Sequence, residues 1–372
     1  MGSKKEKILM VSCDGLGNGG VQAVIMNVAR NLTKTYTFDI VVFTKEKRLH
    51  ELEFKELGGK IFRIPKLAET KFPLKRLDYY FRGVYIYCSL LKILKKNGPY
   101  AAIHCHNAFE SGICLKAAKK VGIPVRISHV HMVHTKEHFL RNVYDRKYLG
   151  LINRYATHKI GCSAEACQSY FGREARTKVV NNPYDSIRFD PKKYNFKVSN
   201  SPIISQIGYF SENKNQLFSL DVVAKIKEEY PNVKLNLIGF DVGGHLCVIE
   251  NRIKELNLIS NVTIHPSNAD TPEILSGSNA FLFPSKKEGF GIVLIEAQAM
   301  GVPCYASDSI PQNTDCGGCI FLPLGKGASF WAERIICDFK NSGKDRKTYN
   351  CEEFSLSRVM EQYNKLYRGE QW

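Results

Sequence analysis

The sequence predicts an α/β protein built from two parallel-sheet domains, and three observations lead to this prediction. The chain of 372 residues is longer than one ordinary core allows, so two domains of roughly 150–200 residues are expected. Short apolar runs of strand length alternate with helix-length segments, which is typical of parallel sheets with helical crossovers. A glycine-rich turn follows the first apolar run, as in folds where a strand leads into a ligand-binding helix.

The first predicted domain comprises residues 1–194 and 355–372. Its first strand, 7–13, runs into the glycine turn 14–20 and then a helix to residue 32 with apolar side chains on one face. A second helix is expected at 50–57. The prolines and mixed polar residues of 182–200 indicate a linker to the next domain. Further strands are expected at 38–44, 60–64, 101–106, 124–131, 158–162 and 177–181.

Residues 74–97 form a long predicted helix in which tyrosine, leucine and lysine side chains are interleaved. One interpretation is a packing helix whose lysine stems lie along apolar surface. The other is a membrane-surface patch that uses aromatic and basic side chains together. The sequence leaves both interpretations open.

The second predicted domain comprises residues 195–354. A last helix, 354–367, is long enough to return to the first domain. The carboxyl edges of the two parallel sheets are predicted to face a central cleft, where ligands of such folds bind. The strands expected here are 202–208, 233–239, 262–265 and 279–284, with helices up to 229, at 245–256 and at 293–300.

Composition limits the cellular context of the chain. No run of about 18 apolar residues occurs, and the charged N-terminus precedes only a strand-length apolar segment, so neither a signal peptide nor a spanning helix is expected. Twelve cysteines without a regular framework indicate reduced thiols in a cytoplasmic protein. The one CxxC, Cys316 to Cys319, lacks a second pair at zinc-finger spacing.

The net charge of +17 is concentrated in the first half of the chain. Residues 1–195 hold 35 Lys and Arg against 16 Asp and Glu, a charge of +19, and the remainder holds 18 against 20, a charge of −2. A one-sided basic domain indicates an acidic partner such as nucleic acid, anionic lipid or a phosphorylated substrate, or merely a soluble basic surface.

Six of the ten histidines lie within residues 104–138, and several end predicted strands. A zinc site is one interpretation, but no H-x-x-x-H pair comes with an acidic third ligand except His134 and His138, which have no convincing helix. Strand-end histidines lie where α/β ligands bind, so substrate contact by His129 or His131 is the favoured interpretation, and no metal is predicted.

The most restrictive string is 281–306, which predicts a strand, a turn, a helix and a strand and holds two acids, Glu288 and Glu296. Lys214 and the amides that begin the helix could neutralise a diphosphate leaving group. Glu296 could accept hydrogen bonds from a ribose diol, and Glu288 from hydroxyls of a sugar. No DxD pair occurs, so a divalent metal is not indicated for the diphosphate.

KEGFGIVLIEAQAMGVPCYAS resembles the E-x7-E signature of family 4 retaining glycosyltransferases, a GT-B-fold group that includes bacterial capsule and exopolysaccharide enzymes. The resemblance covers nearly the whole chain, with GNGGVQAVIMNVARNL near the start and IGYFSENKNQ in the second domain. It implies that Glu288 contacts the donor sugar, Glu296 the ribose and Lys214 the diphosphate. The implied catalytic residues are Glu288, His129 and Lys214, and the implied donor-binding residues are Gly19, Gly20, Tyr209, Lys214, Glu288, Gly289, Phe290, Gly291 and Glu296.

Tyr209 departs from the family pattern, which usually has an arginine directly after the glycine of IGYFSENK. A phenol can donate one hydrogen bond but brings no charge, so Lys214 would hold the diphosphate with less help.

The resemblance implies a cytoplasmic, cofactor-free enzyme that moves a hexose or N-acetylhexosamine from a nucleotide sugar, with a UDP-sugar expected from the family's habit. The expected acceptor is a saccharide or a polyprenyl-diphosphate-linked saccharide, reached at the inner face of an anionic membrane, and no nucleic acid is expected. Three alternatives stay open: a GT-B-fold sugar-nucleotide epimerase, an NAD-dependent oxidoreductase suggested by Gly15-x-Gly17-x-x-Gly20, and a basic binding module.

Overall fold

The computed structural model divides the chain into two compact units. The first unit is Met1–Pro183 with Leu356–Trp372, and the second unit is Tyr184–Ser355. The predicted boundary after residue 194 therefore lies inside the second unit. The described residues are 5–17, 19–65, 78–106, 110–133, 139–195, 199–341 and 346–371.

The sheet of the first unit has seven strands, all parallel, in the order β3-β2-β1-β4-β5-β6-β7. Each strand coincides with an apolar run predicted from the sequence, and the interior strands are almost completely buried. The strands are β1 (Glu6–Ser12), β2 (Tyr36–Val42), β3 (Ile61–Arg63), β4 (Ala102–Cys105), β5 (Val125–Val130), β6 (His158–Gly161) and β7 (Lys178–Val179).

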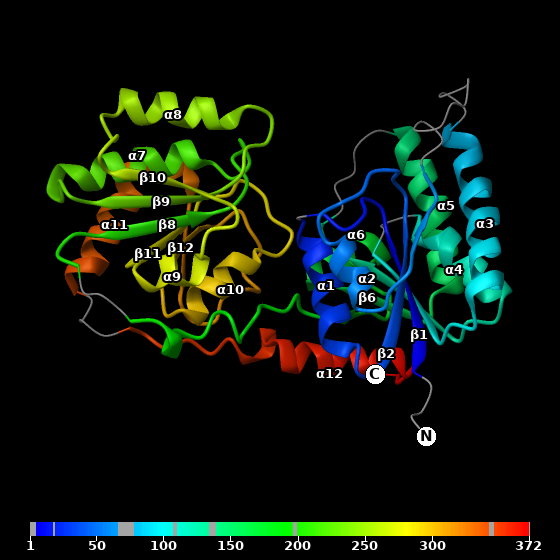
Figure 1. Ribbon diagram of the computed structural model, residues 1–372. Helices are drawn as coiled ribbons and strands as arrows, with labels where there is room; N and C mark the ends of the chain where they lie inside the picture. Colours follow the sequence, from blue (N-terminus) through cyan, green and yellow to red (C-terminus); the bar gives the residue numbers. More distant parts are fainter. Residues whose placement is uncertain are drawn as a thin grey trace. The chain divides into compact units, whose positions relative to one another are not determined.

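The last helix of the chain, α12 (Leu356–Tyr367), belongs to the first unit, where Figure 1 shows it in red beside α1 (Gly20–Leu32). Val359, Tyr363 and Leu366 are fully buried in one core cluster with α1 and the strands. The other helices of this unit are α2 (Glu51–Glu56), α3 (Asp78–Asn97), α4 (Ser111–Lys120), α5 (Phe139–Tyr155) and α6 (Ala164–Phe171), of which the sequence had indicated α2 and α3.

Helix α3 packs through a stripe of Ile86, Leu90 and Leu94, each at most 3% exposed. This spacing of four residues agrees with the packing interpretation of the helix. Residues 74–77 of the predicted helix lie outside the described part of the chain. Among the described residues, no helix combines the length and the apolar character that crossing a membrane requires.

The sheet of the second unit has six parallel strands in the order β10-β9-β8-β11-β12-β13. The sequence had not indicated β13, which is short and follows a cysteine- and glycine-rich turn. The strands are β8 (Ile203–Ile207), β9 (Lys234–Gly239), β10 (Val262–Pro266), β11 (Ala280–Phe283), β12 (Cys304–Ser307) and β13 (Cys319–Leu322).

The helices of the second unit enclose this sheet (Figure 1). Leu220 of α7, Ile249 of α8 and Trp331 of α11 are fully buried in one core cluster with the strands. The helices are α7 (Gln216–Glu229), α8 (His245–Glu255), α9 (Thr271–Ser276), α10 (Ile292–Ala299) and α11 (Gly327–Asn341), of which α9 and α11 had not been predicted.

Both sheets have the doubly wound order, in which the chain starts at a central strand and reverses direction once. The reversal lies between β1 and β4 in the first sheet and between β8 and β11 in the second. In such sheets the loops at the carboxyl ends of these two strands diverge and leave space for a ligand. The loops after β1, β4, β8 and β11 are therefore the positions where binding residues are expected.

Arg346 holds the ends of two helices of the second unit together. Its guanidinium donates to the carbonyls of Met300 at 2.8 Å and Leu275 at 2.8 Å, and also to those of Ser276 and Ser278. These acceptors lie at the carboxyl ends of α9 and α10 or just beyond them, where helix carbonyls lack partners and a cation is favoured. Burial lowers the pKa of Arg346 to about 10, so the side chain is still charged at neutral pH.

We expect Arg346→Met to destabilise the protein by roughly 3 kcal/mol, because several partly buried carbonyls lose their donor at once. The melting temperature should fall by roughly 6–10 °C in thermal unfolding followed by circular dichroism. Arg252→Ala is the control, because Arg252 forms exposed ion pairs with Asp221 and Glu255 and its loss should cost less than about 1 kcal/mol. Equal melting temperatures for the two variants would contradict this role of Arg346.

Candidate active site

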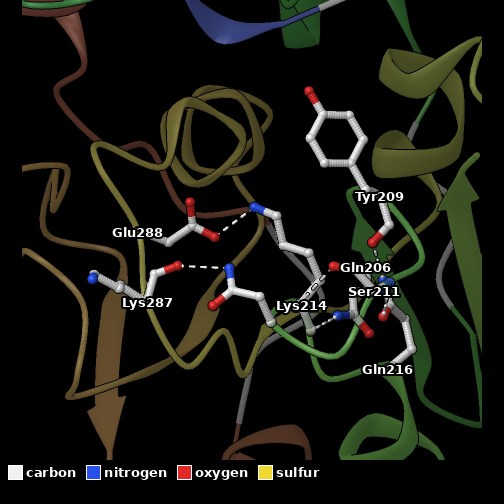
Figure 2. Close-up of polar contacts among 8 residues, drawn as sticks. Gln206, Tyr209, Ser211, Lys214, Gln216, Lys287 and Glu288 are labelled. Atoms are coloured by element: carbon white, nitrogen blue, oxygen red, sulfur yellow. Dashed lines mark hydrogen bonds and ion pairs between the residues drawn. The ribbon is translucent and has the colours of Figure 1, made fainter. Parts of the chain in front are cut away.

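Lys214 and Glu288 meet on neighbouring loops of the second unit (Figure 2). Lys214 lies in the loop between β8 and α7, and Glu288 in the loop between β11 and α10. The Nζ atom of Lys214 donates to Oε1 of Glu288 at 2.5 Å, and the two side chains are 16% and 12% exposed. The pair thus occupies the reversal point of the second sheet and keeps limited contact with solvent.

The path of the Lys214 side chain depends on Gly208. A Cβ atom at position 208 would lie 3.3 Å from both Cδ and Cε of Lys214, which is tighter than most real contacts. At its far end the Nζ atom lies 5.0 Å from the centre of the Phe283 ring, a cation–π distance. A glycine at the end of β8 and an aromatic ring at the end of β11 therefore direct the ammonium group toward Glu288.

Hydrogen bonds to backbone carbonyls join the two loops to each other. The Nδ2 atom of Asn213 donates to the carbonyl of Lys287 at 2.8 Å, and the amide of Lys286 donates to the carbonyl of Asn213 at 2.9 Å. Asn215 donates to the carbonyl of Pro284 at 3.2 Å. Since these contacts fix both loops before any ligand binds, the site is preorganised.

Two helix N-termini begin beside the Lys214–Glu288 pair. Asn215 precedes α7 with φ 57°, and Gly291 precedes α10 with φ 83°; neither residue caps its helix with a side chain. The left-handed conformation is open to glycine and tolerated by asparagine. Uncapped amides at a helix start favour an anion, so this end of the unit can bind phosphate groups with the help of Lys214.

Tyr209 lies on the same loop as Lys214, and its side chain is partly exposed. Its ring packs edge-on against Phe240, with centroids 4.7 Å apart. Burial, and to a lesser degree the nearby Glu288 carboxylate, raises the pKa of the phenol. Tyr209 is therefore neutral, and Lys214 is the cation that this loop contributes beside Glu288 (Figure 2).

Glu296 lies in α10, eight residues after Glu288, which lies in the preceding loop. The surroundings of Glu296 disfavour the charged form of its carboxyl group. Burial raises the pKa of this carboxyl group to about 8, an effect that Arg188 partly opposes and Asp185 reinforces. The group is thus largely protonated at neutral pH. The side chain of Phe290 is 5% exposed and packs edge-on against Phe354, so this position can offer only its backbone to a ligand.

The remaining candidates belong to the first unit. Gly19 and Gly20 begin α1 in the loop after β1, at the reversal point of the first sheet. Nothing lies within 4 Å of a Cβ built on Gly20, so the backbone is open to a close approach. His129 instead lies in β5 with no exposed surface, which argues against direct contact between its ring and a substrate.

His129 is part of a cluster of four imidazoles with His104, His106 and His131. Its Nδ1 atom lies 3.1 Å from Nε2 of His104, and Nδ1 of His106 lies 2.9 Å from Nε2 of His131. Burial lowers the pKa of His104 and of His131 to about 3, and lowers those of the other two as well, so the rings are neutral. His134 and His138 lie outside the described residues.

Sequence reasoning identified Lys214 and Glu288 but missed the residues that support them. Asn213 and Asn215 join the loops, and Gln216 holds the Lys214 loop through the carbonyl of Tyr209 at 2.7 Å. The polar string NKNQ directly before a helix was the available signal. The repeated H-x-H at the ends of two strands was the corresponding signal for the histidine cluster.

Two doubly wound parallel-sheet units, with a lysine–glutamate ion pair at the reversal point of the second, have the architecture of the GT-B class of proteins. Residues 18–188 match the sequence family Glycosyltransferase Family 4, and residues 187–316 match Glycosyl transferases group 1. The chain is 31% identical to EpsF of Bacillus subtilis (strain 168), which carries the name of a glycosyltransferase, over 90% of this chain and 88% of EpsF. The chain belongs to glycosyltransferase family 4.

A second relative and a solved structure agree with this assignment. The capsular polysaccharide biosynthesis glycosyltransferase CapH of Staphylococcus aureus is 24% identical over 81% of each chain. The crystal structure of Anabaena HepE in complex with UDP superposes with a TM-score of 0.78 at 16% identity and covers 97% of this chain and 98% of HepE. The GT-B fold predicted from the sequence is thereby confirmed. Because the chain belongs to a family of glycosyltransferases, this assignment is preferred over the oxidoreductase, epimerase and binding-module alternatives.

Proposed function

We propose that this glycosyltransferase moves a hexose or N-acetylhexosamine, with retention of configuration, from a UDP-sugar to a saccharide or lipid-linked saccharide in cell-surface polysaccharide synthesis. The observation that carries the proposal is the Lys214–Glu288 pair, at 2.5 Å, between two uncapped helix starts. The charge of +19 in residues 1–195 supports an anionic, membrane-presented acceptor.

In the proposed donor complex each group of the second unit has a separate role. Lys214 and the amides at the start of α10 bind the diphosphate, with the backbone of Gly289, Phe290 and Gly291 closest to it. Glu288 accepts hydrogen bonds from hydroxyls of the sugar, and Glu296 accepts them from the ribose. Gly19 and Gly20 of the first unit offer open backbone to a substrate.

The proposed reaction breaks the bond between the anomeric carbon and the diphosphate oxygen while the acceptor oxygen bonds to the same face of that carbon. The acceptor proton passes to the departing phosphate oxygen, so the products are the glycoside and the nucleoside diphosphate. Glu288 is held by Lys214 and acts by positioning hydroxyls rather than as a base. Lys214 and the helix amides stabilise the leaving group, and we propose that transfer needs no added divalent metal.

The test is a thermal-shift screen of the purified protein against nucleoside diphosphates and their sugars, followed by transfer to acceptors. UDP and one UDP-sugar should raise the melting temperature, since a donor binds only the folded chain. Transfer should proceed without added Mg²⁺ or Mn²⁺, and nuclear magnetic resonance should show the donor's anomeric configuration in the product. An inverted product, or stabilisation by a purine nucleotide alone, would overturn the corresponding part of the proposal.

Tyr209→Arg should tighten UDP binding by about tenfold, because a guanidinium adds a charge-assisted hydrogen bond where the phenol offers a neutral one. Isothermal titration with UDP measures the change. Tyr209→Phe is the control, since it keeps the ring that packs on Phe240 and removes only the hydroxyl. If the arginine variant bound UDP no better than the wild type, Tyr209 would not face the diphosphate.

UDP affinity should rise about eightfold from pH 7 to pH 8.5, because ribose hydroxyls need the carboxylate of Glu296 and its pKa is about 8. The same raised pKa affects folding. The Glu296 carboxyl group keeps its proton in the folded protein up to about pH 8 but loses it in the unfolded chain near pH 4.5, so its contribution to stability decreases as the pH rises from about 4.5 to 8. Titration calorimetry with Glu296→Gln provides the comparison, since its affinity should not follow this curve. An equal rise in both proteins would assign the effect to another group.

A further inference from the structure

Four histidines project from the carboxyl ends of two neighbouring strands. His104 and His106 are two residues apart at the end of β4, and His129 and His131 are two residues apart at the end of β5. Side chains two apart on a strand share a face, and β4 and β5 pair in parallel with His104 opposite Ile127. The two H-x-H pairs therefore form a two-by-two array on one face of the sheet, with rings of His104 and His129 stacked at 5.3 Å.

The distances within the array are those of metal ligands. One nitrogen each from His104, His106 and His129 can be chosen so that all three lie within 4.8 Å of one another. Nitrogens that bind one tetrahedral ion at 2.0–2.1 Å lie about 3.3 Å apart. The pair His104–His129 is at 3.1 Å and the pair His106–His131 is at 2.9 Å, so small ring movements suffice to admit an ion.

The array also contains buried nitrogens that form no hydrogen bond within the described part of the protein. They are Nε2 of His106, Nε2 of His129 and Nδ1 of His131. His129 has no exposed surface and His106 is 7% exposed. A buried polar atom without a partner costs about 1–3 kcal/mol, so the hydrogen bonds within the array do not satisfy all of its nitrogens.

A second group orients one of the rings. Nδ1 of His104 lies 2.9 Å from the hydroxyl of Tyr367 in α12, and this hydroxyl is buried. If Nδ1 carries the proton and donates it to Tyr367, the lone pair of Nε2 faces His129. Metal-binding histidines characteristically donate their other N–H in this way, which fixes the tautomer.

We propose that His104, His106 and His129 bind one divalent transition-metal ion of the zinc class, with His131 next to the site as the hydrogen-bond partner of His106. Imidazole suits Zn²⁺, Cu²⁺ or Ni²⁺. Mg²⁺ and Ca²⁺ prefer oxygen ligands, and the four histidines of the array offer only nitrogen. On binding, the proton that His129 shares with His104 moves from Nδ1 of His129 to its Nε2, on the side away from the ion. The ring stays neutral, so binding releases no net proton. The ion would tie β4 to β5 and, through Tyr367, to α12 of the first unit.

The experiment uses full-length protein without a histidine tag, dialysed against metal-free buffer and titrated with Co²⁺ and with Zn²⁺. The wild type should bind one Co²⁺ per chain with the visible absorption of tetrahedral nitrogen coordination, and Zn²⁺ should displace it and raise the melting temperature. His106→Gln should weaken Co²⁺ affinity by at least roughly a hundredfold, and Tyr367→Phe by roughly tenfold.

His158→Gln is the matched control, because His158 lies on the next strand, β6, and both of its ring nitrogens have partners, Thr157 and the carbonyl of Glu370. It should bind Co²⁺ as the wild type does. Equal Co²⁺ binding by wild type and His106→Gln would mean an adventitious ion only and would overturn the proposal, as would octahedral spectra. Should His106→Gln fail to fold, the Tyr367→Phe titration decides, because unchanged affinity there also contradicts the site.

Discussion

Replacing Lys214 with alanine is expected to lower kcat/KM for the sugar donor by about a thousandfold. The variant removes the ammonium group that we assign to the departing diphosphate, and loss of one such preorganised donor costs about two to three orders of magnitude. UDP affinity should fall as well, because the diphosphate is present in both ligands. Steady-state kinetics and titration with UDP measure the two effects.

A neighbouring ion pair supplies the control for Lys214→Ala. Lys286 pairs with Glu212 at 2.8 Å and joins the same two loops, but these side chains are 48% and 81% exposed. Lys286→Ala should therefore keep activity within about twofold, since an exposed pair contributes little. Comparable losses in the two variants would mean that the loops merely need to be joined, and would contradict a direct role for Lys214.

Every strand except β13 could be predicted, and most clearly the interior strands, which are buried on both faces and appear as continuous apolar runs. Strand β11, for example, is Ala280–Phe283 with every residue buried, and proline and serine follow it. Helix α5 was harder, since polar residues interrupt its apolar positions, whereas α11 has a regular apolar face that was missed in the sequence. The strand order could not be predicted, because it depends on which buried edges pair and not on any one segment.

The residue types of the proposed donor site are visible in the sequence, but their arrangement in space is not. A lysine before one helix and a glutamate before another were visible in the sequence, but their contact across 74 positions follows from the adjacency of β8 and β11. The protonation of Glu296 follows from burial by distant residues, which no local pattern carries. The histidine array likewise exists only once β4 and β5 are neighbours.

Glu288→Gln should lower kcat by roughly a hundredfold while UDP affinity stays equal to that of the wild type or increases. The amide keeps the size of the side chain but loses the negative charge that accepts hydrogen bonds from the sugar hydroxyls and from Lys214. Stabilisation specific to the transition state is therefore lost. Lys214, released from its ion pair, should bind the diphosphate at least as well as before. Single-turnover kinetics and UDP titration separate the two quantities.

The opposite effects on UDP distinguish the roles of the two residues. Lys214→Ala weakens UDP binding, whereas Glu288→Gln does not, because only the lysine is assigned to the diphosphate. Glu212→Gln is the control for the glutamate, since Glu212 is exposed and pairs with Lys286 on the same loops. If Glu288→Gln transferred sugar at the wild-type rate, Glu288 would serve only to hold Lys214, and the sugar hydroxyls would have to be positioned by other groups.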